Sequence, residues 1–262
     1  PVGKIGQFDL LLINYCIEGR CEIALGDDRF IYMEPGSLSL DTKPAQDSFV
    51  SPVGRYGGVE IIVDLPLMKD GLPSTFQDLE ISPSLLSNKY CPSNKSFITK
   101  AQAGIAAVYE KMTCARAPSL SYYRLVTAEL LHMLTVLPLP DMKRTGAWLT
   151  RGQSAIVSQV HERITSNLQQ RLSIEKLAAG YGISSSSLKN YFYTVYGQQI
   201  SPYLREARMA EATRLLRYTN ERISAVATAV GFENQSKFAA VFRSVIGDSP
   251  LEYRRKCRCG IL

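Results

Sequence analysis

Residues 223 to 254 constrain the fold of this chain more than any other stretch, because their apolar residues follow two short helical periods separated by a glycine. The first period consists of Ile223, Val226, Ala227 and Val230, and Gly231 ends it. A second run begins at Asn234 and places Phe238, Val241, Phe242 and Val245 on one stripe. The spacing predicts two short helices joined by a tight turn, with Gly231 at positive φ.

The other face of the second predicted helix is unsuited to a core. Its side chains are short, polar or cationic: Gln235, Ser236, Ala239, Ala240 and Arg243. A half-buried helix that a partner helix holds at a fixed angle suits insertion into a DNA major groove. The pattern therefore predicts a helix-turn-helix unit.

The same pattern occurs once more upstream. Gly182 precedes Gly231 by 49 positions, and Ile174, Leu177 and Ala178 match at the same offset, whereas Phe192 and Gly197 match Phe242 and Gly247 at an offset of 50. One residue is therefore inserted in the second turn. In each half we expect helix, turn, helix and a glycine stop, and then a serine N-cap with proline at the first helical position, at Ser201-Pro202 and Ser249-Pro250.

At these residues the chain resembles the AraC/XylS family of transcription regulators. The family's C-terminal signature is matched by three segments, Ala227 to Phe232, Phe238 to Arg243 and Gly247 to Arg254, and the resemblance covers roughly residues 153 to 256. It implies a bacterial-type regulator, more often an activator, that binds double-stranded DNA and contacts RNA polymerase. One position departs from the family, because Ala240 stands where an arginine is common.

The family motif also implies which side chains meet DNA. In the first unit Ser186, Lys189 and Asn190 are expected to contact bases, with Asn190 suited to adenine and Lys189 to guanine. The outward residues of that helix are Ser185, Ser186, Lys189, Asn190 and Tyr193. The corresponding set in the second unit is Asn234, Gln235, Ser236, Lys237 and Arg243, with Gln235 and Ser236 expected on bases and Lys237 and Arg243 on the backbone.

The charge is unevenly distributed along the chain. Residues 1–150 hold 14 basic and 16 acidic residues, a balance of −2, whereas residues 151–262 hold 16 and 8, a balance of +8. The basic half is the half with the repeat. Its charge favours binding to phosphates through counterion release.

Residues 8 to 65 read as short strands with turns at Gly19-Arg20, Pro35-Gly36 and Gly57-Gly58. This punctuation resembles that of the cupin-like domain that precedes the DNA-binding half in many regulators of the family. We therefore expect an α+β chain: an N-terminal cupin-like β-barrel plus helices, and a C-terminal all-α domain with two helix-turn-helix motifs.

The composition argues against an enzyme of cupin type. The only histidines, His132 and His161, fall in predicted helices outside the barrel, so a histidine-built metal site in the barrel is excluded. We expect both to be satisfied, partly buried side chains. The six cysteines show no Cys-x-x-Cys spacing. We expect no catalytic residues, no metal and no cofactor.

A small barrel can hold one ligand among its inward side chains. Candidates to line it are polar or aromatic: Tyr15, Arg20, Tyr32, Arg55 and Tyr56. Arg20 and Arg55 could pair an anionic effector. Ordinary turn and surface roles for these residues explain them equally well.

Helices are expected over residues 97–137, with a broad apolar stripe from Ser119 to Leu137. In the family a helix at this place pairs two subunits, which would make the chain a homodimer through Tyr123, Leu130, Leu134 and Leu137. Alternatively, the stripe only covers the barrel. The predicted domains are residues 1–137, a linker at 138–152 and a DNA-binding domain at 153–262.

Two interpretations of function stay open. In the first the chain is a sequence-specific activator controlled by a small-molecule effector in the N-terminal domain. In the second it binds DNA, while the N-terminal domain only dimerises or binds a protein partner. The chain has no run of 18 apolar residues and no signal-peptide pattern, so we expect no membrane span and a cytoplasmic protein.

Overall fold

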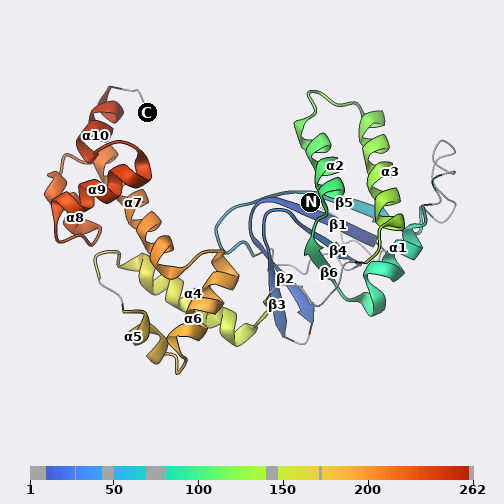
Figure 1. The fold of residues 1–262 in the computed structure, drawn as a ribbon, viewed down its shortest axis with the longest axis horizontal. Coiled ribbons are helices and arrows are strands. Elements are labelled where there is room, and N and C mark those ends of the chain that lie inside the picture. Colours follow the sequence, from blue (N-terminus) through green and yellow to red (C-terminus); the bar gives the residue numbers. More distant parts are fainter. Residues whose placement is uncertain are drawn as a thin grey trace, which may run out of the picture. The chain divides into compact units, whose positions relative to one another are not determined.

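The computed structural model describes residues 10–26, 28–42, 50–68, 79, 81–139, 147–170 and 173–259. The chain divides into two compact units, Pro1–Arg151 and Gly152–Leu262. The first contains strands and helices, whereas the described part of the second contains helices alone (Figure 1). The predicted α+β class is confirmed.

The first sheet of the N-terminal unit is antiparallel, with the strand order β5-β1-β4-β6. Its strands are β1 (Leu10–Gly19), β4 (Ser37–Asp41), β5 (Tyr56–Asp64) and β6 (Phe97–Lys100). Ile13 pairs with Leu40 on one side and with Ile61 on the other, so that these apolar residues share one face. That face packs against helices and forms the main core of the unit.

The second sheet has the order β2-β3-β7. Its strands are β2 (Cys21–Gly26), β3 (Arg29–Met33) and β7 (Leu149–Thr150). A small apolar cluster joins the two sheets: Cys16, Cys21, Ile31, Met33 and Ile98. The described strands thus form two antiparallel sheets, and no described strand pair closes them into a ring. Phe8 and Asp9, where we expected the first strand to begin, lie outside the described residues.

Helices cover the core face of the first sheet (Figure 1). They are α1 (Pro83–Tyr90), the short 3-10 helix η2 (Pro92–Asn94), α2 (Ala103–Cys114) and α3 (Leu120–Val136). Ser119 caps α3, because its side chain accepts a hydrogen bond from the Tyr122 amide. The prediction of helix at residues 97–100 is wrong: these residues form β6 and pair with β4.

The last residues of the predicted linker belong to the N-terminal unit. Leu149 pairs with Phe30, and its side chain is only 2% exposed. Arg151 donates from its backbone amide and from Nε to Asp28, both at 3.2 Å, and its guanidinium lies 4.9 Å from the Phe30 ring centroid. Residues 140–146 of the linker lie outside the described residues.

The second unit contains the two predicted helix pairs. Its helices are α4 (Arg151–Ser166), α5 (Ile174–Ala179), α6 (Ser185–Tyr196), α7 (Ile200–Tyr218), α8 (Ile223–Ala229), α9 (Gln235–Ile246) and α10 (Pro250–Arg258). In Figure 1, α4 to α6 gather near one end of α7 and α8 to α10 near the other. The pairs α5–α6 and α8–α9 confirm the repeat read from the sequence.

The two predicted serine caps differ in outcome. Ser249 caps α10 with Pro250 in the first turn, and Glu252 completes a capping box. The equivalent prediction at Ser201-Pro202 is wrong, because α7 begins earlier, at Ile200, and its N-cap is Gln199. Ser201 therefore lies inside the first turn of the connecting helix.

Candidate nucleic-acid interface

The turns that present α6 and α9 have nearly the same construction. Gly182 and Gly231 take φ values of 66° and 81°, and the residue after each donates its amide to an alanine carbonyl of the preceding helix. The next helix begins with a side-chain cap: Ser184 accepts from the Ser187 amide, and Asn234 accepts from the Lys237 amide, both at 3.0 Å. Glu233 is the inserted residue of the second turn.

The inner faces of α6 and α9 are anchored by aromatic side chains. Phe192 in α6 and Phe238 and Phe242 in α9 are fully buried. One stripe assignment needs correction: Val245 is 43% exposed, because it lies at the edge of the stripe near the end of α9. On α6, Tyr191 is partly buried and accepts a hydrogen bond from Gln153.

The outer faces of both helices carry most of the predicted DNA-contacting residues. On α6, Ser186, Lys189, Asn190 and Tyr193 are exposed, whereas Ser185 is partly buried. On α9 the exposed residues are Gln235, Ser236, Lys237, Ala240 and Arg243. Asn234 is exposed too, and its side-chain oxygen caps the helix. Each unit therefore presents a short, polar, solvent-facing helix surface on a rigid aromatic base.

A carboxylate lies close enough to attract a cation on the outer face of each helix: Glu175 attracts Lys189 of α6, and Glu252 attracts Arg243 of α9. The Ser173 hydroxyl donates to Glu175, which holds the pKa of that carboxyl below its usual value, and Lys189 adds a smaller attraction. Hydrogen bonds at Ser249 lower the pKa of Glu252 in the same way, with Arg243 contributing less. Both carboxylates are ionised at neutral pH, so a DNA phosphate competes with them for Lys189 and Arg243.

Both histidines are satisfied side chains, as predicted. His161 stacks on Tyr196 with ring centroids 4.8 Å apart, and its Nε2 lies 2.6 Å from the Tyr203 hydroxyl. Burial lowers the pKa of His161, which favours the neutral ring at neutral pH. His132 places Nδ1 3.1 Å from the carbonyl oxygen of Leu79. The described residues contain no cluster of three or more His, Cys, Asp and Glu side chains that could hold a metal ion.

The predicted effector residues do not gather around one cavity. Tyr15 stacks on Tyr109 in the core beneath the helices, with ring centroids 4.5 Å apart, whereas the ring of Tyr56 packs against the cluster between the sheets. The Tyr56 hydroxyl donates to Asn14 at 2.8 Å, and that of Tyr32 donates to Glu22. The structure therefore corrects the expectation that these residues line a common site. Arg55 is exposed.

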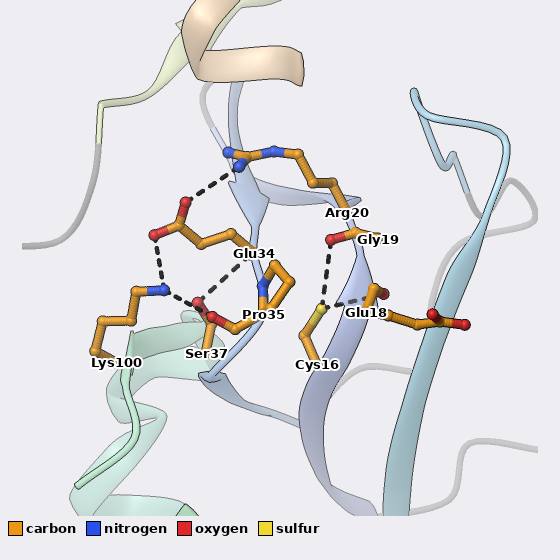
Figure 2. Close-up of polar contacts among 8 residues, drawn as sticks. All are labelled: Cys16, Glu18, Gly19, Arg20, Glu34, Pro35, Ser37 and Lys100. Carbon is orange, nitrogen blue, oxygen red and sulfur yellow. Dashed lines mark hydrogen bonds and ion pairs between the residues drawn. The ribbon is translucent and has the colours of Figure 1, made fainter. Parts of the chain in front are cut away.

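Arg20 belongs to an ion-pair network that Figure 2 shows. Glu34 accepts from Arg20 at 3.1 Å and pairs with Lys100 at 2.7 Å, and these contacts lower the pKa of Glu34, the Lys100 hydrogen bond most strongly. Cys16 lies beside this network, but burial raises the pKa of its thiol to about 11. Because Glu34 already accepts from Arg20, an anionic effector would have to displace that carboxylate.

The predicted dimer contacts on α3 also need correction. Leu130 and Leu134 are fully buried in the core of their own unit, so their side chains cannot reach a second subunit. Leu137 is partly buried against the same core, and Tyr123 is 40% exposed. Three other apolar residues of α3 are exposed, Leu120, Leu125 and Val136, and none of them was among the predicted dimer contacts.

Within the described part of the chain, no helix is both long and apolar enough to cross a membrane.

A family model described as a helix-turn-helix domain matches residues 177–256. The chain is 33% identical over 105 residues to the HTH-type transcriptional activator AarP of Providencia stuartii, which covers 40% of this chain and 78% of that protein. It is 29% identical over 106 residues to the HTH-type transcriptional activator RhaR of Enterobacter sp. (strain 638), covering 40% of this chain but only 38% of RhaR.

One similar solved structure is the DNA-binding domain of AdpA, a global transcriptional factor, in complex with a target DNA. It is 26% identical and covers 39% of this chain and 93% of that chain, with a TM-score of 0.38.

Proposed function

Because the chain belongs to the AraC family of DNA-binding transcription regulators, we propose that it recognises a specific double-stranded DNA sequence and activates transcription there. AarP and RhaR are both named as activators. The observation that carries the proposal is the pair of solvent-facing helix surfaces on α6 and α9, each on a buried aromatic base. An activator of this kind acts on RNA polymerase, which is the protein partner we propose.

The helix α7 provides a spacer of suitable length. Its 19 residues span about 28 Å at 1.5 Å per residue. Adjacent major-groove segments on one face of a duplex lie about 34 Å apart. We therefore assign α6 and α9 to two successive segments of one site. The positive balance of residues 151–262 supplies the sequence-independent part of the affinity.

The polar side chains of α6 are assigned to base reading. Asn190 suits adenine and Lys189 suits guanine, with Gln235 and Ser236 contacting bases from α9. Lys237 and Arg243 are assigned to phosphates. Replacing Asn190 by Ala should lower the affinity for a duplex that the full chain selects from a random pool by about 1 to 3 kcal/mol, with little effect on random DNA. Fluorescence anisotropy at fixed salt measures both affinities.

Two variants calibrate this experiment. Arg243→Ala should weaken the selected and the random duplex by the same factor, because a phosphate contact carries no sequence information. Asn88→Ala removes an exposed amide from the N-terminal unit and should change neither affinity. If Asn190→Ala weakens both duplexes equally, Asn190 does not read a base.

For the N-terminal unit we propose control by a small polar effector, held between its two sheets. Asn14 pairs in register with Ser39, which is buried, and accepts a hydrogen bond from Tyr56. These polar groups lie on the same face of the first sheet as Cys16, and this face packs against the second sheet. Polar side chains inside an apolar layer are the feature that orients small ligands.

A thermal-shift screen of the full chain against metabolites tests effector control. A ligand at 100 times its dissociation constant adds about 2.7 kcal/mol to the stability of the unit that binds it, so the melting transition of the N-terminal unit should rise. If no compound raises it and the chain sediments as a dimer, the N-terminal unit serves dimerisation or a protein partner instead.

A further inference from the structure

Arg208 lies near the middle of α7, the helix that joins the two helix pairs, and its side chain contacts a segment from each half of the second unit. Its Nε donates to the carbonyl oxygen of Leu168 at 3.0 Å, and its Nη2 donates to that of Gln170 at 3.2 Å. Leu168 and Gln170 follow the C-terminal end of α4. The guanidinium Cζ also lies 5.9 Å from the ring centroid of Phe232, in the turn between α8 and α9.

Each contact partner of Arg208 is fixed within its own half. Helix α4 is tied to α6, because Gln153 donates to the Tyr191 hydroxyl at 2.9 Å and His161 stacks on Tyr196. In the other half the Phe232 ring packs edge-on against Phe238, the buried anchor of α9, with centroids 5.6 Å apart. Arg208 therefore connects two packed bodies, each of which carries one recognition helix.

The backbone at Gly231 shows how closely these segments meet. A Cβ atom at this position would lie 2.5 Å from the carbonyl oxygen of Leu168 and 2.6 Å from Nη2 of Arg208. The turn between α8 and α9 thus lies directly against the Arg208–Leu168 hydrogen bond. The end of α4, the middle of α7 and this turn meet at one point.

We propose that Arg208 is a brace that fixes the separation and rotation of α6 relative to α9, and so sets the spacing of the two DNA segments that the chain reads. The inference rests on the proposed function. One base pair changes the separation by about 3.4 Å and the rotation by about 35°. Long helices bend readily, so α7 alone defines this geometry poorly. A guanidinium presents its donors in a rigid planar fork and can stack that plane on a ring, whereas a lysine ammonium is a point charge on a flexible stem and fixes the orientation of its partners less.

A measurement without DNA tests the brace itself. Nitroxide labels are attached at Lys176→Cys on α5 and Ala225→Cys on α8, both exposed positions. The full chain that carries them has serine in place of Cys114, Cys257 and Cys259. Pulsed electron paramagnetic resonance then reports the distance between the two helix-turn-helix pairs. Arg208→Met keeps an apolar stem and removes the donors. It should at least double the width of the distance distribution. The matched control is Arg205→Met, an exposed arginine on the same helix, which should leave the width unchanged.

A second measurement tests the consequence for DNA. The probe is a duplex selected from a random pool by the wild-type chain, together with versions that carry one base pair more or less between its two footprinted segments. The wild-type chain should prefer the selected spacing by about tenfold or more, and Arg208→Met should reduce that preference to less than about threefold. Arg205→Met changes the net charge by the same amount and should keep the preference, although its overall affinity falls. Arg208→Lys should lie between wild type and Arg208→Met.

The two readouts separate the possible failures. An unchanged distance distribution in Arg208→Met overturns the brace, as does a broader distribution with an unchanged spacing preference. Equal losses of affinity at all spacings also overturn it, because they describe general destabilisation. If the wild-type chain selects no duplex at all, the proposed function fails, and the distance distribution alone then decides whether Arg208 fixes the two units.

Discussion

Gly231 and Gly182 have the same left-handed backbone but different surroundings, which separates conformational strain from close contact. At Gly182 a Cβ atom would meet nothing within 4 Å, whereas at Gly231 it would collide with Leu168 and Arg208. Gly182→Ala should therefore cost about 1 to 2 kcal/mol of unfolding free energy, from the left-handed backbone alone. Gly231→Ala should cost about 1 to 3 kcal/mol more, from overpacking. Urea unfolding of the full chain, followed by hydrogen exchange in α5 and α6 for Gly182→Ala and in α8 and α9 for Gly231→Ala, measures the two costs. Equal losses would show that the close contact at Gly231 adds nothing.

Single residues differ in how far the sequence predicts them. Gly231 and Asn234 were predictable as a turn glycine and the start of a helix, because their roles depend on neighbours within a few positions. Arg208 was not, since its partners Leu168 and Phe232 lie 40 and 24 positions away. The sequence likewise did not predict that Tyr15 and Tyr56 lie on opposite faces of one sheet, because the face depends on the strand register.

At the scale of elements, Lys89 of α1 caps the C-terminal end of α3, although the two are far apart in the sequence. Its Nζ donates to the carbonyl oxygens of Leu134, Thr135 and Leu137 at 2.8, 2.8 and 2.6 Å. These are the groups that a helix C-terminus leaves without a partner. Lys89→Met should destabilise the N-terminal unit by about 1 to 3 kcal/mol. As a control, Lys111→Met removes only an exposed ion pair with Glu129 and should cost about 0 to 1 kcal/mol. Thermal unfolding followed by Trp148 fluorescence reports the difference, and equal costs would show that Lys89 is no cap.

Helices with strong local signals were predicted well, and short segments were not. The stripe and Ser119 cap of α3 define it within one or two residues. Residues 97–100 continue an apolar pattern that also fits a helix, and pairing with β4 decides for a strand. The stripe of α3 was wide enough to suggest a subunit interface. Leu130 and Leu134 show that this width instead reflects packing against the sheet and α1.

At the scale of the whole molecule, an internal repeat and a one-sided charge carried the functional prediction. Both properties are visible in the sequence because they extend over the entire C-terminal half. The N-terminal half offers no comparable signal. Whether a predicted effector or dimer residue can meet a partner depends on which contacts the fold already gives its side chain. Arg20, for example, is already paired with Glu34. The sequence therefore predicted one function for the C-terminal unit, which contains the repeat, but only alternative functions for the N-terminal unit.

Hydroxyl-radical footprinting of the full chain on a duplex selected from a random pool tests the central claim most directly. If one chain inserts α6 and α9 into successive major-groove segments, two protected segments should appear with centres about 10 base pairs apart, on the same face of the duplex. A single protected segment, or two segments on opposite faces, would contradict the account.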